Sequence, residues 1–140
     1  MKLDNAMPLP GITGSLDLYV ADTESLSSLT QRKYTVTITE AGTPLRATIV
    51  WIDPVNVMWS SKVLLNDLDL IVTSPSGEVF YGNNITADEF NPVERVFVPS
   101  AEMGDWTVVV VAHELAVGSG QDYSIVITSD TGVKEELTNV

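Results

Sequence analysis

The sequence predicts an all-β protein, an antiparallel β-sandwich or jelly roll of about eight strands. Apolar residues either alternate with polar ones or form short β-branched runs, and helical spacing is almost absent. Gly, Pro and Asn separate these segments at short intervals. The chain has 140 residues, of which 44% are hydrophobic, and this suits one folded domain rather than a disordered chain.

The expected strands follow one another closely. They cover residues 16–20, 34–38, 45–51, 68–72, 78–81, 95–98, 106–112 and 123–128. The segments 34–38 and 45–51 alternate, as half-buried strands do. A Ser-Pro-Ser-Gly turn precedes the segment 78–81, and Pro99 ends the segment 95–98. The segment 106–112 is apolar throughout its centre, which predicts burial on both faces.

Composition changes at both ends of the chain. Residues 1–15 contain two prolines and two glycines, and we expect an N-terminal arm or linker there. Residues 16–129 form the expected β-domain. Residues 130–140 are polar, and we expect a frayed C-terminal tail. The sequence has neither a run of roughly 18 apolar residues nor the apolar segment of a signal peptide, so we expect a cytosolic protein or a piece of a longer one.

The charge balance argues against two classes of partner. The chain has 19 acidic and 7 basic residues, a net charge of −12. Such a chain is repelled by the phosphates of nucleic acids and by anionic lipid, so we expect neither a nucleic acid nor a membrane as partner. The charge favours solubility and a monomer. The absence of cysteine excludes disulfides and thiolate zinc sites.

Catalytic patterns are missing from the sequence. The single histidine, His113, is expected to be a solvated residue at the end of a strand. The sequence contains no Gly-x-Ser-x-Gly elbow, no glycine-rich phosphate loop and no His-Glu-x-x-His zinc motif. A two-carboxylate glycosidase of this size without an aromatic cleft would be unusual. We therefore expect that the chain is not an enzyme by itself.

Acidic residues suggest calcium. Asp67 and Asp69 alternate with leucines in an expected strand, so both carboxylates point to the same face and repel each other unless a cation or a proton intervenes. A second oxygen-rich stretch, 83–89, contains Asp88, and loops between neighbouring strands would bring it near Asp69. Calcium prefers such oxygen ligands. Spacing alone equally allows that Asp67 and Asp69 cap turns or accept backbone N–H groups.

Aromatic residues offer a different kind of site. Trp51 and Trp106 lie inside apolar strands, and we expect both in the core. Val57, Met58 and Trp59 lie in an otherwise polar loop, and we expect them to form part of a binding surface. The segment 84–86 is also an N-glycosylation sequon, which matters only in a eukaryotic secretory pathway.

Seven motifs in order give the chain a resemblance to a known family. They are Pro44–Pro54, Leu64–Leu70, Thr73–Gly77, Tyr81–Asn83, Asn91–Glu94, Gly104–Val108 and Gly120–Ser124. In this order they resemble the C-terminal β-jelly-roll domain of subtilisin-like serine proteases of the oxidatively stable alkaline type. They are more distantly similar to the P-domain of kexin- and furin-like convertases. The resemblance covers about residues 16–129.

The resemblance implies an eight-stranded jelly roll that follows a catalytic domain in a secreted protease. The catalytic Asp, His and Ser of the family lie upstream of this domain and match no position here. The domain would stabilise or position the catalytic domain and bind calcium through Asp69, Asn84 and Asp88. Asn84 stands where an aspartate is usual, which lowers the affinity expected for the ion. Asp67 is nominated by spacing and is only a neighbour in the family motif.

One alternative comes from a different class of function. Jelly rolls are common scaffolds of lectins, so the fold alone also suits a stand-alone module for carbohydrate or extended peptide. Exposed, coplanar Trp59 and Tyr81 rings would favour carbohydrate or peptide binding. A flat apolar surface near the N-terminal arm would favour docking to a protease domain.

Overall fold

A computed structural model describes residues 16–55, 63–84, 86, 88–130 and 133–139. Within these residues the chain is all-β, as predicted, with no α-helix. The strands are β1 (Asp17–Leu26), β2 (Thr30–Ile38), β3 (Leu45–Trp51), β4 (Asn66–Thr73), β5 (Val79–Tyr81), β6 (Val93–Val98), β7 (Gly104–Leu115), β8 (Gln121–Ser129) and β9 (Val133–Asn139), and the short 3-10 helix η1 (Gly82–Asn84) follows β5. The described residues contain no helix that is long and apolar enough to cross a membrane.

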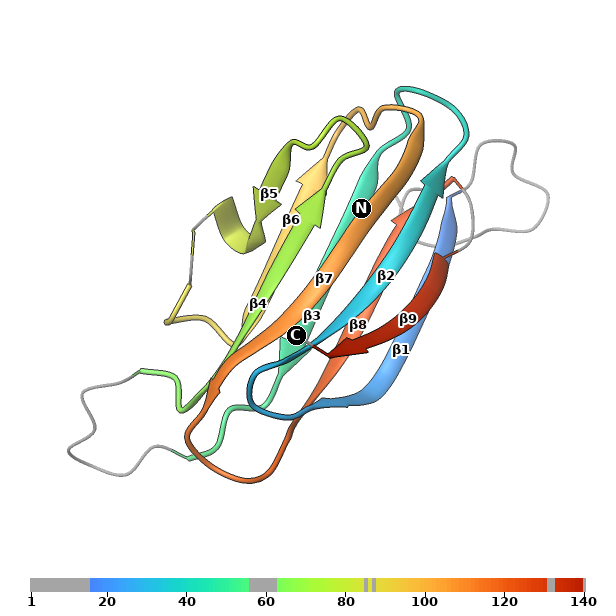
Figure 1. Cartoon of the computed structure of the whole chain (residues 1–140). Helices are drawn as coiled ribbons and strands as arrows, with labels where there is room; N and C mark the ends of the chain where they lie inside the picture. Colours follow the sequence, from blue (N-terminus) through green and yellow to red (C-terminus); the bar gives the residue numbers. More distant parts are fainter. Residues whose placement is uncertain (1–15, 56–62, 85, 87, 131–132, 140) are drawn as a thin grey trace.

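Two antiparallel sheets pack against each other as a β-sandwich (Figure 1). The first sheet has the strand order β1-β8-β3-β6, and the second has the order β5-β4-β7-β2-β9. Most neighbours in each sheet are distant in sequence, because the chain crosses repeatedly from one sheet to the other. The predicted β-sandwich is confirmed. It leaves β1 and β6 at the edges of the first sheet, and β5 and β9 at the edges of the second.

The core lies between the two sheets and follows from strict alternation along the strands. In β3, Leu45, Ala47, Ile49 and Trp51 are all buried while their neighbours point outward. Trp51 is 3% exposed and Trp106 is 2% exposed, which confirms that both tryptophans belong to the core. Two tyrosines form a polar pair within the core. The hydroxyls of Tyr34 in β2 and Tyr123 in β8 lie 2.9 Å apart across the two sheets.

β7 is less deeply buried than its apolar sequence predicts. Val108 and Val110 face the core and are fully buried. Val109 and Val111 point to the outside of the second sheet and are only half-buried. In the register of the second sheet they lie between residues of the flanking strands β2 and β4. The expectation of burial on both faces is therefore wrong for the outer face.

The C-terminal end differs from the expected frayed tail. Val133–Asn139 form β9, which pairs antiparallel with β2 along its length. Just before β9, the Oδ2 atom of Asp130 accepts the backbone N–H groups of Thr39 and Glu40 at 3.0 and 2.9 Å. A strand at the edge of a sheet needs no apolar alternation, so the polar sequence of β9 did not indicate a strand.

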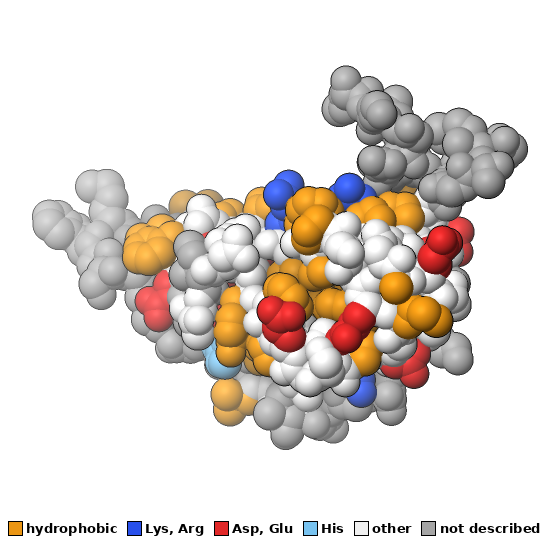
Figure 2. All heavy atoms as spheres, turned by 90° about the horizontal axis from the view of Figure 1, so that it is seen from above, with side chains coloured by type: hydrophobic (Ala, Val, Ile, Leu, Met, Phe, Trp, Pro, Cys, Tyr) orange, Lys and Arg blue, Asp and Glu red, His pale blue; other side chains and the backbone are white. Residues whose placement is uncertain are grey.

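The surface mixes hydrophobic and acidic side chains. Viewed from above in Figure 2, both kinds reach the surface at one end of the sandwich. Six of the exposed large hydrophobic residues belong to the outer side of the first sheet or to its immediate continuation. They are Val20, Val50, Ile52, Val93, Phe97 and Val126, and they are 38–89% exposed. The first sheet therefore presents an apolar outer face to solvent.

Candidate functional site

Four carboxyl groups gather where the first half of β4 faces β6 and the segment between η1 and β6. We call them the acidic cluster: Asp67, Asp69, Asp88 and Glu94. β5 pairs only with Ile71–Thr73 of β4, so within the described residues the earlier part of β4 has no strand neighbour on that side. The cluster lies along this open part of the strand. Repulsion between its members contributes to the raised pKa of Asp67 and to that of Glu94.

Asp69 is buried and is held by two partners. Its Oδ2 atom lies 2.9 Å from Nε2 of His113, and its carboxylate also accepts a hydrogen bond from the backbone of Asp88. Burial raises the pKa of Asp69, and these two partners only partly offset that effect. His113 lies within β7 at an irregularity in its pairing with β4, with its side chain 58% exposed. The expected solvated character is confirmed, but His113 is a strand residue and is paired with Asp69.

Asp67 is repelled by Asp69, as the spacing of the two residues in the strand predicts. Burial, followed by repulsion from Asp69 and Glu89, raises the pKa of Asp67 to about 6. Its Oδ1 atom is buried and has no hydrogen-bond partner in the described part of the chain. A buried carboxylate oxygen without a partner is costly, and a cation or a proton would relieve that cost.

Asp88 is the best-satisfied carboxyl of the cluster. It is fully buried, which acts to raise its pKa, yet hydrogen bonds outweigh burial and hold that pKa below its usual value. Nδ2 of Asn83 donates to one oxygen at 2.9 Å, and Nδ2 of Asn91 reaches both oxygens at 2.8 and 3.1 Å. The backbone N–H of Phe90 adds a further bond at 3.1 Å. Asp88 therefore holds the segment before β6 in place.

Asn83 connects this segment to the free edge of β6. Its side chain donates to the carbonyl of Val93 at 2.9 Å and accepts the N–H of Arg95 at 3.2 Å. The amide thus replaces a neighbouring strand at the edge of the sheet. Asn83 and Asn84 both have positive φ, at 54° and 58°, a conformation that Asn tolerates better than most residues. Asn84 is exposed, beside the buried network rather than in it.

Glu94 is the member of the cluster that sequence reasoning missed. It is 1% exposed, and its Oε2 atom accepts the backbone N–H of Leu70 at 2.6 Å, which joins β6 to β4 across the two sheets. Its Oε1 atom is buried, and none of the described residues forms a hydrogen bond with it. Burial, then repulsion from Asp69 and other members of the cluster, raises the pKa of Glu94 to about 8, although the Leu70 N–H acts to lower it. The alternation of β6 could have revealed it, because Glu94 shares the inward face with Val96 and Val98.

Gly82 makes room for Glu94. A Cβ atom at position 82 would lie 2.1 Å from Oε2 of Glu94 and 2.8 Å from its Cβ. No side chain fits there without movement of Glu94 or η1. The Tyr-Gly-Asn sequence after β5 thus has a packing role beneath the acidic cluster.

The four residues expected to bind calcium are only partly brought together. Asp67, Asp69 and Asp88 share the cluster, and Asn84 lies in the exposed turn beside it. Carboxylate oxygens suit calcium in kind and in charge, and the Oδ1 atom of Asp67 forms no hydrogen bond with the described residues. Asp88 fits less well, because its oxygens already face N–H donors. Among the described side chains, no three His, Asp or Glu residues are arranged to hold a metal.

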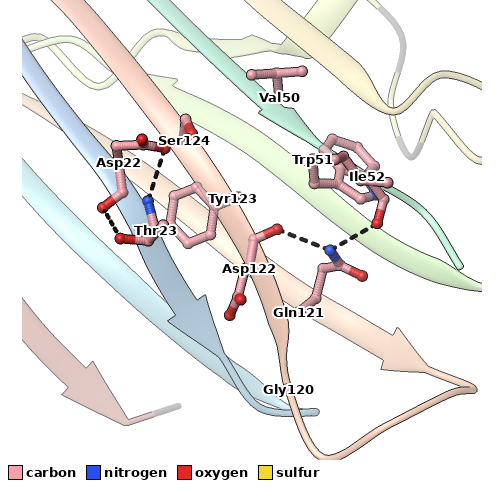
Figure 3. A pocket seen from close by; sticks show the side chains of 10 residues that line it. All are labelled: Asp22, Thr23, Val50, Trp51, Ile52, Gly120, Gln121, Asp122, Tyr123 and Ser124. Carbon is pink, nitrogen blue, oxygen red and sulfur yellow. Dashed lines mark hydrogen bonds between the residues drawn. The ribbon is translucent and has the colours of Figure 1, made fainter.

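A second feature is a hollow of about 640 Å³ on the outer side of the first sheet (Figure 3). It is lined by Asp22, Thr23, Val50, Trp51, Ile52, Gly120, Gln121, Asp122, Tyr123 and Ser124. A β-bulge in β1 accompanies it. Ala21 pairs with Ile125 and Glu24 with Tyr123, so two residues of β1 lie opposite one residue of β8. The hollow could not be predicted from the sequence, because it depends on the register between β1 and β8.

The expected binding surface at Val57, Met58 and Trp59 lies outside the described residues, as does the N-terminal arm 1–15. No protein-family model matches the chain, and no curated protein matches it. The likeness to subtilisin-associated domains therefore remains a prediction from the seven motifs.

Proposed function

We propose that this chain is a non-catalytic accessory domain of a secreted subtilisin-like serine protease. In this proposal the domain stabilises or positions the catalytic domain, and calcium binds at the acidic cluster. The proposal is supported first by the motifs of the resemblance and second by the structural roles that residues in these motifs have. The residues of the acidic cluster then supply the argument for calcium.

Three of the motifs meet at one end of the sandwich. Asp53 accepts the backbone N–H groups of Leu65 and Asn66 at 2.9 and 2.8 Å. The side chain of Asn66 donates to Gln121 at 2.9 Å and exchanges hydrogen bonds with the backbone of Val117. These residues come from distant parts of the sequence and form one partly buried polar network. Their spacing thus has a reason in the fold, and this supports a resemblance at the level of a whole domain.

The observation that carries the calcium proposal is the unrelieved repulsion within the acidic cluster. In the described part of the chain, Asp67 and Glu94 each keep a buried oxygen without a partner, and the imidazole of His113 lies against Asp69. A divalent cation beside Asp67 and Asp69 would replace this repulsion with attraction. Asn84 and Asp88 complete the proposed ligand set. Asp88 contributes an oxygen only if an amide donor from Asn83 or Asn91 turns away.

The accessory role can be tested in cells that encode the chain. An antibody against the chain is used after the lysate and medium have been labelled with a fluorophosphonate probe, which reacts with active serine hydrolases. The proposal expects the antibody to capture a labelled species that is heavier than the 15.2 kDa chain. Denaturation before labelling is the control, because it abolishes active-site labelling. An unlabelled species of about the chain's own mass would overturn the proposal.

The hollow favours a second candidate function. A concave site of this volume is within the size range of small-ligand and side-chain pockets, about 300–1,000 Å³. It supports the alternative in which the domain is a binding module for carbohydrate or extended peptide. The lining residues help to choose between these two ligands.

A further inference from the structure

The hollow at the β1 bulge has a negative rim. Asp22 and Asp122 supply carboxylates, and the described residues of its lining include no Lys or Arg. The Asp22 carboxylate accepts the N–H of Thr23 at 2.9 Å and the hydroxyl of Ser124, which holds it at the edge of the hollow (Figure 3). Asp122 is exposed. These carboxylates, in a chain with a net charge of −12, give the hollow a negative electrostatic potential, which favours a cationic group there.

The opposite wall of the hollow is aliphatic. Val50 is 44% exposed and Ile52 is 89% exposed. Val93 pairs with Val50 on the next strand and continues this apolar surface across the first sheet. An aliphatic stem would therefore lie against Val50 and Ile52 while its charged end reaches the carboxylates. Lysine and arginine side chains combine these two properties.

The aromatic residues of the lining do not provide a platform for a sugar ring. Trp51 is 3% exposed and Tyr123 is 2% exposed, so their ring faces are used by the core. Sugar binding commonly relies on an exposed aromatic face, and Val50 and Ile52 do not supply one. The lining thus favours peptide over carbohydrate.

We propose that the hollow binds a lysine or arginine side chain of an extended polypeptide segment of a partner protein. Gln121 braces the floor by donating to the carbonyls of Ile52 and Asp122 at 3.1 and 2.8 Å. Residues beside the basic one then contact Val50 and Val93. This inference rests on the proposed role of the domain in engaging a protein partner. It does not depend on calcium or on a protease as the partner.

The test is an NMR titration of the ¹⁵N-labelled chain in EDTA. The probe is the capped peptide acetyl-Thr-Val-Lys-Val-Thr-amide, and the matched peptide replaces lysine with norleucine, which keeps the aliphatic stem and removes the charge. The lysine peptide should shift the backbone amides of Thr23, Ile52, Asp122 and Ser124 in a saturable manner. The norleucine peptide should bind about two- to fivefold more weakly, the size expected for an exposed ion pair.

Three variants locate the contact. Asp122→Asn should weaken the lysine peptide about two- to fivefold and leave the norleucine peptide unchanged. Ile52→Ala should weaken both peptides, because it shortens the aliphatic wall. Asp17→Asn, an exposed carboxylate outside the hollow, should change neither.

Several results would overturn the inference. They are no shift at about 5 mM peptide, shifts centred outside the hollow, or equal binding of the two peptides. Because the titration is done in EDTA on the isolated chain, a failure here is independent of the calcium site. It is also independent of the labelling experiment, which tests membership in a protease.

Discussion

Glu94 is a buried residue with two structural contacts. Its carboxyl joins the two sheets through the N–H of Leu70 and lies directly against Gly82. Sequence alternation could have placed it inside the sandwich, because Val96 and Val98 on the same face are buried. Its partner could not have been predicted, because the contact joins strands that are not neighbours in either sheet. Asp88 is similar: the sequence nominated it as a ligand, and the structure shows that amide donors surround it.

Glu94 should make stability depend on pH. Its pKa rises from an ordinary 4.5 to about 8 on folding, so the folded state binds an extra proton between these values. The free energy of unfolding should therefore fall as pH rises through this window, by up to about 1.4 kcal/mol per pH unit. Asp67 adds to the same trend below about pH 6. Asp69 and Asp88 also face Glu94 and contribute to its shift.

Urea denaturation at a series of pH values measures this dependence. Glu94→Gln, which cannot ionise, should flatten the profile between about pH 6 and 8, and Glu78→Gln, at an exposed position in a turn, should leave it unchanged. A wild-type profile that is flat or rises with pH in this window would contradict the assigned burial of Glu94.

Gly82 should be intolerant of any side chain. Gly82→Ala places a Cβ atom 2.1 Å from Oε2 of Glu94 and should cost about 1–3 kcal/mol of unfolding free energy. Gly77→Ala is the comparison, because its positive φ is strained but nothing lies within 4 Å of the added Cβ. Denaturation midpoints measure both variants. A smaller loss for Gly82→Ala than for Gly77→Ala would show that the contact with Glu94 is not tight.

At the scale of elements, most strands could be predicted from the sequence, but the edge strand β9 and the bulge in β1 could not. Alternation identified β2 and β3 because each has one face in the core. The strand β9 was not predicted because its sequence is polar and its partner, β2, lies far away along the chain. The bulge in β1 was not predicted because the pair Asp22-Thr23 is not a recognisable turn sequence. In the structure Thr23 has a φ of 59°. The hollow depends on that bulge and was missed with it.

The turn between β5 and β6 should depend on Asn83 more than on its neighbour Asn84. Asn83→Ala removes hydrogen bonds to Asp88, Val93 and Arg95 and should cost about 1–3 kcal/mol. Asn84→Ala is a matched control, since Asn84 has a similar positive φ but is exposed. Urea denaturation in EDTA measures the difference, and hydrogen exchange at the Arg95 amide reports on the edge of β6. Equal losses in the two variants would refute the bracing role of Asn83.

For the whole molecule, the two proposed sites lie at different places in the sandwich. The acidic cluster lies where β4, η1 and β6 meet, whereas the hollow lies on the outer side of the first sheet near β1 and β8. Composition and alternation predicted the sandwich because they depend only on which side of each strand is apolar. They predicted part of the cluster from neighbouring acidic residues. They could not predict Glu94 or the hollow, which require the arrangement of strands in space.

The most direct test of the account is a thermal melt of the chain in about 1 mM calcium and again in excess EDTA. If calcium binds the acidic cluster only in the folded state, calcium at about 100 times its dissociation constant should raise the midpoint by roughly 5–10 °C. Asp69→Ala should abolish this rise, and Asp17→Ala, an exposed carboxylate outside the cluster, should retain it. The same midpoint in calcium and in EDTA, or a rise that persists in Asp69→Ala, would contradict the calcium site at this cluster.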